Sequence, residues 1–133
     1  MPMKPILSYL ILFSLLVSSG VIAREVKPNT ASIRCGWFDN PTPGNAWLMD
    51  RDGEWVIGIQ GGYQAEGEWP TFTDSQWIKT NGGYGYGCAC LKVIADQKTR
   101  EVSRKTREVS RIISARAVPL SQCRRDRALK EPT

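Results

Sequence analysis

Residues 84–95 read YGYGCACLKVIA and are the most informative stretch of this 133-residue chain. Side chains two positions apart on a β-strand point to the same face of the sheet. The stretch therefore predicts a strand with Cys88 and Cys90 on one face, each free to meet a partner elsewhere. The chain has two other cysteines, Cys35 and Cys123. We expect Cys35 to pair with one cysteine of the motif and Cys123 with the other, which would tie both ends of the domain to this strand.

Disulfides persist mainly in exported proteins, and the N-terminus has the layout of a signal peptide. Within residues 1–23, Lys4 is the only charged side chain and an apolar stretch runs from Ile6 to Val17. Small and apolar residues up to Ala23 offer a cleavage site. An uncleaved membrane anchor is the alternative, but the stretch is short for a span and is interrupted by serines. We expect export to the periplasm or outside the cell, with membrane contact only before cleavage.

A zinc site and a redox pair are the other uses that four cysteines could have. Their spacing in this chain matches no common pattern of zinc ligands, and exported cysteines mostly oxidise. A redox dithiol needs a depressed thiolate pKa, usually from a helix N-terminus, and the sequence predicts no such helix. The even number of cysteines therefore favours two structural disulfides.

Residues 24–133 have the length of a single domain with a thin core. Short runs of alternating polarity, separated by glycine and proline, are typical of β-strands joined by turns. We expect strands over residues 32–37, 77–79, 84–95 and 109–118, a loop over 40–45, and no helix of ordinary length. The expected class is all-β or mainly β, a small antiparallel sheet or barrel-like domain stapled by two disulfides. An extended hairpin connection over 98–111 and a basic C-terminal tail complete the expected domain.

A tight hairpin is expected where Asp50 and Gly53 stand at the first and fourth positions of a type I turn. A three-residue loop would pair Asp50 with Glu54. A two-residue loop at Asp52-Gly53 would split the apolar side chains between two faces, so we expect the three-residue loop. Its register predicts one apolar face, made of Trp47, Met49, Trp55, Ile57 and Ile59.

An exact tandem repeat follows the central strand, because residues 98–104 and 105–111 both read KTREVSR. Seven is an odd number, so an insertion within a paired strand would turn every later side chain to the wrong face. We expect the extra copy to be looped out or to form a turn or two of helix. Deletion of residues 98–104 should therefore leave the fold intact.

Aromatic residues must supply both the core and any contact surface. Of the twelve in the chain, Tyr9 and Phe13 lie in the signal segment and the other ten lie between Trp37 and Tyr86. We expect Trp47, Trp55 and Trp77 to lie inside. Sugar rings and peptides both bind surfaces that mix flat aromatic faces with amides. The residues of this kind, our candidates for binding, are Trp37, Asn40, Asn45, Gln60, Tyr63, Asn81, Tyr84 and Tyr86.

Catalytic and metal sites find weaker support. The chain has no histidine. Three carboxylates at Asp50, Asp52 and Glu54 could suggest a calcium loop, but the pattern lacks the remaining ligands of such a loop. A glycosidase pair drawn from Glu66, Glu68 and Asp74 would need a fixed separation across a cleft, which a sequence cannot show. We assign no catalytic residue, no metal and no cofactor.

Charge divides the domain in two. Residues 35–90 carry two basic and seven acidic side chains, a net charge of −5, whereas residues 91–133 carry twelve basic and five acidic ones, a net charge of +7. The basic part could meet an acidic partner, an anionic glycan or a membrane face. We expect it to be mainly a solvated surface. Nucleic acid is not an expected partner, because single-strand sites need aromatic and basic residues along one groove.

The motifs together resemble a family of short exported bacterial proteins known as domain of unknown function 4087. They are Cys35-Gly36-Trp37, Asn40–Asn45, Trp47-Leu48, Asp52-Gly53 with Trp55, Gln60–Tyr63, Thr80–Gly82, Tyr84–Cys90, Pro119-Leu120 and Cys123–Asp126. The resemblance covers nearly all of residues 24–133, and the repeated seven residues depart from it. It implies export and a single domain but no activity. Tyr86–Cys90 is also similar to the start of the Tyr-x-Cys-x-x-Gly motif of periplasmic inhibitors of c-type lysozyme, although Leu91 stands in place of the glycine.

The sequence thus favours an exported, monomeric binding module for a cell-wall glycan or for a protein partner such as a hydrolase. The loop at Asn40–Asn45 and the turn at Asn81–Tyr86 would make the contacts. A small carboxylate-dependent hydrolase and a purely structural envelope protein are the alternatives.

Overall fold

The structure is a computed structural model that describes residues 2, 20, 30–99 and 105–133, with the backbone alone described for residues 96–99 and 105–106. Strands dominate the described chain. The elements are β1 (Ser32–Thr42), β2 (Asn45–Asp50), β3 (Gly53–Gly58), the 3₁₀-helix η1 (Asp74–Gln76), β4 (Trp77–Asn81), β5 (Tyr84–Thr99), β6 (Lys105–Val118) and α1 (Leu120–Arg125). None of the described residues belongs to a helix long and apolar enough to cross a membrane.

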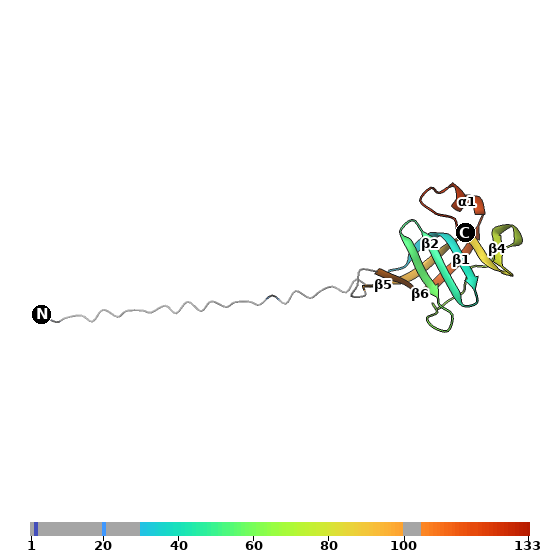
Figure 1. Cartoon of the computed structure of the whole chain (residues 1–133). Helices are drawn as coiled ribbons and strands as arrows, with labels where there is room; N and C mark the ends of the chain where they lie inside the picture. Colours follow the sequence, from blue (N-terminus) through green and yellow to red (C-terminus); the bar gives the residue numbers. More distant parts are fainter. Residues whose placement is uncertain (1, 3–19, 21–29, 100–104) are drawn as a thin grey trace.

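Five of these strands close into a barrel (Figure 1). Their order is β1-β2-β3-β6-β5, and β5 pairs back onto β1 to complete the circle. The pairs are antiparallel except for β3 and β6, which run parallel and meet where Val56 pairs with Glu108. β4 is an additional strand that pairs with the start of β5. The expected mainly β, barrel-like class is therefore confirmed.

β5 is the strand to which most of the fold is attached. One edge of it pairs with β1, and the other edge pairs first with β4 and then with β6. Where β1 and β4 flank it together, β5 contains Gly85, and a Cβ atom there would collide with the carbonyl oxygen of Ile78. Glycine is required at this position because it lets the backbones approach closely.

Both disulfides start from β5, as the Cys-Ala-Cys motif predicts. Cys90 is bonded to Cys35, its direct neighbour in the β1–β5 ladder, with a Cα–Cα distance of 4.0 Å. Cys88 is bonded to Cys123 of α1, with a Cα–Cα distance of 5.8 Å. The sequence alone left open which cysteine of the motif takes which partner. The second bond also explains why so short a helix is held in place, since it has six residues.

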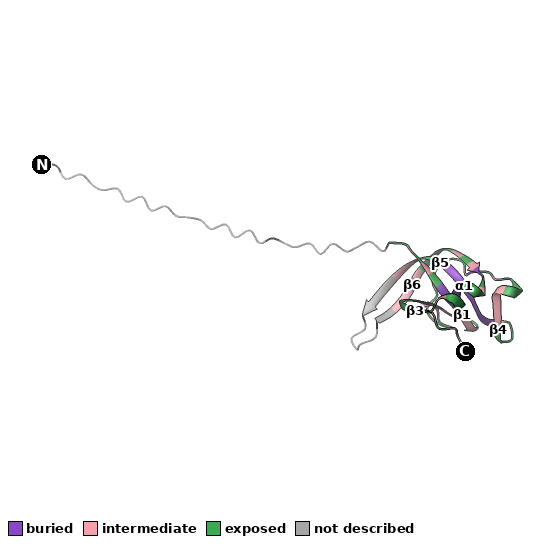
Figure 2. Ribbon diagram, turned by 90° about the horizontal axis from the view of Figure 1, so that it is seen from above, coloured by how far each residue is buried: buried purple, intermediate pink, exposed green. Residues whose placement is uncertain are grey.

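The two faces of β5 belong to two different apolar clusters. Figure 2 colours the buried residues of this strand purple. The interior cluster fills the barrel and comprises Phe38, Ala46, Leu48, Trp55, Ile57, Ala89, Leu91, Val93, Val109 and Ile112. The outer cluster lies between the barrel wall and α1 and comprises Trp37, Tyr86, Cys88, Cys90, Val118 and Cys123. Strand alternation thus buries both sides of β5.

The β2–β3 hairpin differs from the sequence-based prediction, which was wrong about its loop. Asp50 pairs with Gly53 rather than with Glu54, so the loop holds two residues, Arg51 and Asp52. Leu48 then stands opposite Trp55. The expected apolar face is split: Trp55 and Ile57 point inward with Ala46 and Leu48, while Trp47 and Met49 lie on the outer side and Ile59 is 45% exposed.

Hydrogen bonds of the Asp50 side chain explain this register. Its Oδ1 accepts from the backbone N–H of Asp52 at 2.8 Å and from Nε1 of Trp55 at 3.0 Å. Both bonds close the two-residue loop, and Trp55 can reach the carboxylate only from the inner face. Satisfying a buried carboxylate outweighs the preference for a three-residue loop, because an unpaired buried charge costs several kcal/mol, roughly 3–5 in comparable cases.

The tandem repeat lies largely in strands. The second copy, Lys105–Arg111, is part of β6, and the first copy begins with two residues of β5. Residues 100–104 lie outside the described residues. The pairs Gln97 with Arg107 and Thr99 with Lys105 show that the duplication lengthens both arms of one hairpin. The described part of the repeat is therefore neither looped out nor helical, contrary to our expectation.

Candidate functional site

Two of the residues that we selected for binding lie in the core. Trp37 is 0% exposed and Tyr86 is 7% exposed, and their rings meet edge to face with centroids 5.4 Å apart. The hydroxyl of Tyr86 donates to Glu131 Oε1 at 3.0 Å, and Glu131 also accepts from Arg124. The C-terminal segment therefore covers both rings, and neither presents a free surface.

The selected amides hold loops in shape. Nδ2 of Asn40 donates to the carbonyl oxygen of Asn45 at 2.6 Å, and Oδ1 of Asn45 accepts from the backbone N–H of Gln60 at 2.8 Å. These contacts join the β1–β2 loop to the end of β3. Since both amide nitrogens and Oδ1 of Asn45 already have partners, Asn40 and Asn45 act first as structural residues.

The two loops that we expected to make contacts do lie side by side. Nδ2 of Asn81 donates to the carbonyl oxygen of Pro41 at 3.3 Å, which joins the β4–β5 turn to the β1–β2 loop. Tyr84 begins β5 beside this junction and is half-buried. Tyr63 lies elsewhere and donates its hydroxyl to the carbonyl oxygen of Val109.

A better candidate surface lies on the outer side of β1, β2 and β3 and centres on Trp47. In the ladder, Trp47 pairs with Asp39 of β1 on one side and with Val56 of β3 on the other. Directly opposed residues point to the same face of a sheet. Trp47 is half-buried and belongs to neither apolar cluster. The expectation that Trp47 lies inside was therefore wrong, whereas Trp55 is buried and Trp77 packs against the interior cluster.

Further residues extend this surface, which we call the Trp47 face. Tyr86 pairs with Asp39, and Tyr84 projects to the same side of β5 two positions earlier. Met49 and Glu54 form the next pair along β2 and β3. The Trp47 face consists of Asp39, Trp47, Met49, Glu54, Val56 and Tyr84. All are at least partly exposed.

The electrostatics of the Trp47 face are unfavourable in the free protein. Burial, and after it the negative charge of Glu54, raises the pKa of Asp39 above its ordinary value of 3.8. Among the described residues no side chain donates a hydrogen bond to Asp39 or to Glu54, and no cation pairs with either. Two carboxylates beside an exposed indole thus offer hydrogen-bond acceptors that a ligand could use.

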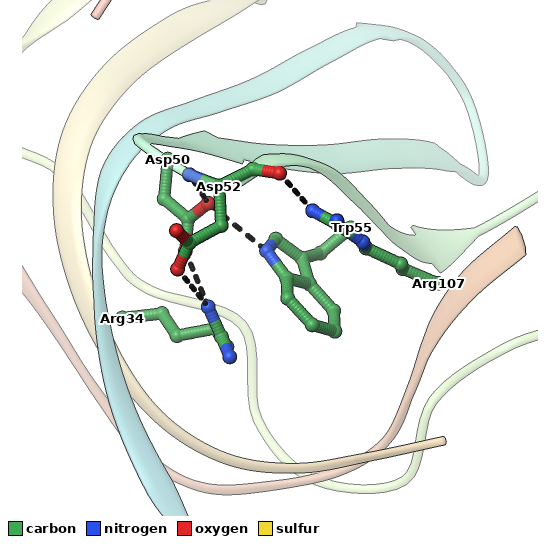
Figure 3. Close-up of polar contacts among 5 residues, drawn as sticks. All are labelled: Arg34, Asp50, Asp52, Trp55 and Arg107. Carbon is green, nitrogen blue, oxygen red and sulfur yellow. Dashed lines mark hydrogen bonds and ion pairs between the residues drawn. The ribbon is translucent and has the colours of Figure 1, made fainter. Parts of the chain in front are cut away.

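The carboxylates that suggested calcium serve the end of the barrel instead (Figure 3). Nη1 of Arg34 binds Oδ2 of Asp50 at 2.8 Å and Oδ2 of Asp52 at 3.2 Å. The guanidinium of Arg34 lies 3.8 Å from the Trp55 ring centroid, and that of Arg107 lies at 5.2 Å. Arg107 also donates to the carbonyl oxygen of Asp52. This cluster closes one end of the barrel, and no group of described residues is arranged to hold a metal.

Two of the three carboxylates considered for hydrolysis, Glu66 and Asp74, have surroundings that the structure describes. Glu66 forms an ion pair with Arg111 at 3.1 Å, and both side chains are exposed. Asp74 begins η1, where the capping-box contacts of Thr73 and Gln76 surround it.

The alternation of side chains in one short stretch of sequence indicates the Trp47 face. Residues 45–50 read NAWLMD, which places Ala46 and Leu48 on one side of a strand and Trp47 and Met49 on the other. We matched the larger side chains to the core. The narrow interior instead takes the smaller pair together with Trp55.

Fold and surface define a small barrel of five strands with one added strand, two disulfides that start from one central strand, and an exposed aromatic and acidic face. The chain belongs to the family described as "Protein of unknown function (DUF4087)", whose model matches residues 29–130, and the resemblance seen in the sequence is thereby confirmed. No curated protein and no solved structure matches it significantly. Two disulfides in so small a domain fit an oxidising environment.

Proposed function

We propose that this chain is an exported binding module that takes a glycan on the Trp47 face. One observation carries the proposal: the partly exposed indole of Trp47 stands directly opposite Asp39, whose carboxylate has no partner among the described residues. The flat face of an indole packs against the C–H face of a sugar ring, and carboxylates accept hydrogen bonds from hydroxyls. An apolar ligand would use the ring and leave the carboxylates unsatisfied.

Export supports a cell-wall glycan as the ligand. Residues 1–23 have the layout of a signal peptide, and the disulfides fit an oxidising compartment. We place the protein in the periplasm or outside the cell on these grounds.

The architecture offers an analogy that points to the same face. The strand order β1-β2-β3-β6-β5 is that of five-stranded Greek-key barrels of the OB type, counted without β4. Such barrels bind oligosaccharides and oligonucleotides on the face of their second and third strands. Trp47, Met49, Glu54 and Val56 belong to those strands here.

A glycan array followed by calorimetric titration tests the proposal. We expect a cell-wall oligosaccharide to bind the wild-type protein and Trp47→Ala to weaken that binding by about tenfold or more, as at other aromatic hot spots. Trp47→Phe should retain part of the affinity because it retains a flat ring. Ile113→Ala, at an exposed position of β6, is the matched control. Binding that survives Trp47→Ala unchanged would remove the Trp47 face from consideration.

A protein partner is the second candidate, favoured by Met49 and Val56 beside Trp47. Methionine and aromatic residues are enriched in the centres of protein interfaces. Capture of a partner, such as a hydrolase, by the wild-type protein but not by Trp47→Ala, without any glycan binding, would select this candidate. Turnover of a bound glycan that is lost in Asp39→Asn would instead indicate a hydrolase.

A further inference from the structure

A second surface has a different chemistry and lies over β1, β5 and β6. The described chain has three exposed large hydrophobic side chains. Ile33, at 73% exposure, lines this surface, and Ile113, at 47%, directly precedes Ser114, which also lines it. Ile33 stands opposite Lys92 in the β1–β5 ladder, and Lys92 stands opposite Ser114 in the β5–β6 ladder. Ile113 precedes Ser114 at a bulge, where the register between β5 and β6 shifts.

Basic side chains surround these isoleucines. Lys92 and Arg116 point to the same outer side, because Cys90, two positions before Lys92, is paired with Arg116. α1 borders the surface where Nε2 of Gln122 lies 4.0 Å from Sγ of Cys90. Arg125 follows Gln122 by three residues and therefore lies on the same side of α1. We call Ile33, Lys92, Ile113, Arg116 and Arg125 the basic isoleucine face.

No described acidic side chain pairs with the cations of this face. Ile33 also lines a neighbouring hollow that contains three acidic side chains. There, Asp50 and Asp52 are bound to Arg34, and Asp126 accepts a hydrogen bond from the backbone N–H of Ala128. The charges of Lys92, Arg116 and Arg125 thus remain available to an anionic partner.

The surface offers little room to bury a small molecule. The hollow between Ile33, Lys92 and Arg116 has a volume of about 180 Å³. Ligand pockets usually have volumes of roughly 300–1,000 Å³. The face is the outer side of the barrel wall, so we expect a partner that can adapt to an open surface.

We propose that the basic isoleucine face docks the protein on an anionic membrane surface. Lysine and arginine near such a surface are attracted by the negative charge of the lipid headgroups. Ile33 and Ile113 would leave water and enter the interfacial region of the membrane, which is favourable in free energy. A hydrophilic polyanion offers no such apolar environment. The exposed isoleucines therefore favour a lipid surface over an anionic glycan. This goes beyond the expectation that the chain meets a membrane only through its signal peptide, and it is independent of the Trp47 face.

Co-sedimentation of the mature protein with vesicles tests the proposal. We expect binding to vesicles of phosphatidylcholine and phosphatidylglycerol, and none to phosphatidylcholine alone. Arg116→Gln and Lys92→Gln should each reduce the partition coefficient roughly fivefold, the effect of one basic residue near an anionic surface. Ile33→Ser should also reduce it. The matched controls are Lys79→Gln and Ile59→Ser, which alter exposed side chains outside this face and should leave partition unchanged.

Three outcomes would overturn the proposal. One is absence of binding to vesicles that contain phosphatidylglycerol. Another is binding that Arg116→Gln and Ile33→Ser both leave unchanged. The third is binding that soluble heparin abolishes and that is indifferent to Ile33→Ser, because the face would then recognise a polyanion or an acidic protein without need of lipid. Circular dichroism of each variant establishes that it remains folded.

Discussion

At the scale of single residues, Asp50 is a buried side chain on whose carboxylate three hydrogen-bond donors converge. Arg34 approaches from β1, Trp55 from β3, and the backbone of Asp52 from the turn. Asp50 itself is 9% exposed. A buried carboxylate is tolerated because these three donors replace the water that it loses on folding.

We predict that Asp50→Ala destabilises the protein by about 3–5 kcal/mol, the usual cost of removing one partner from a buried pair. The substitution would leave the guanidinium of Arg34 and the indole N–H of Trp55 without their acceptor. Asp52→Ala is the matched control, since its carboxylate is 58% exposed and binds the same guanidinium. The control should cost about 1 kcal/mol or less, as exposed pairs do. Urea denaturation of both variants measures the difference, and equal losses would contradict the assigned role of Asp50.

Asp39 differs from Asp50, because no described side chain donates to its carboxylate and its surroundings disfavour the charged form. Its pKa is raised in the folded state. The contribution of this group to stability is therefore greatest below its unfolded pKa and is lost as pH rises through its folded pKa. We predict that Asp39→Asn raises the melting temperature at pH 7. This increase should disappear well below pH 3.8, the ordinary pKa of this group, because the wild-type carboxyl is then also uncharged. The same variant should bind the glycan more weakly. A melting temperature that is lower at pH 7 would show that Asp39 has a stabilising partner.

Among the elements, the β5–β6 hairpin shows how a duplication of odd length is accommodated. An insertion of seven residues within one strand would have turned every later side chain to the opposite face of the sheet. At the tip of a hairpin they lengthen both arms, and the pairs nearer the barrel keep their register.

We predict that deletion of residues 98–104 preserves the barrel. In the shortened chain Gln97 and Arg107 keep their pairing, and Lys105-Thr106 becomes a two-residue loop between them. All pairs from Cys88 with Val118 to Gln97 with Arg107 are retained. The melting temperature should fall by only a few degrees, about 4–8 °C for each kcal/mol of turn strain in a domain of this size.

A second variant separates turn strain from lost contacts. Lys-Thr is a poor sequence for a two-residue hairpin loop, whereas Asn-Gly is a favoured one. Lys105→Asn with Thr106→Gly in the shortened chain should therefore recover most of the loss. Failure to recover, after a large fall, would mean that residues 98–104 make contacts that the fold needs.

At the scale of the whole molecule, the Cys88–Cys123 bond decides which aromatic surface is available. It joins β5 to α1, and the chain that follows places Leu129 and Glu131 against Trp37 and Tyr86. The other disulfide links two strands that are already paired in the sheet. The two bonds thus have different effects on the surface, although each is expected to contribute on the order of 2–4 kcal/mol to stability.

We predict that replacing Cys88 and Cys123 together by serine exposes the Trp37–Tyr86 pair at denaturant concentrations that leave the barrel folded. Tryptophan emission should shift to the red before the far-ultraviolet dichroism changes. The matched control replaces Cys35 and Cys90, and its two signals should change together. Coincident transitions in both double variants would contradict a separate role for the C-terminal segment. Non-reducing peptide mapping of the wild-type protein checks the pairing itself.

Local sequence determined the mainly β class, the central strand and the set of residues that form disulfides. Alternation in residues 84–95 is a property of the strand itself, and two cysteines on one face need two partners whatever surrounds them. Trp55 was correctly expected inside, although the hairpin register that placed it beside Trp47 and Met49 was wrong.

Only the tertiary structure decided which side of β2 faces the core and why Trp37 and Tyr86 are buried. The hairpin register places the carboxylate of Asp50 where Arg34, sixteen residues away in sequence, can bind it from β1. Trp37 and Tyr86 lie on the outer wall of the barrel and would be exposed without the segment after α1. Strand alternation states which side chains share a face, but burial depends on what packs against that face, and here the covering element comes from the other end of the chain.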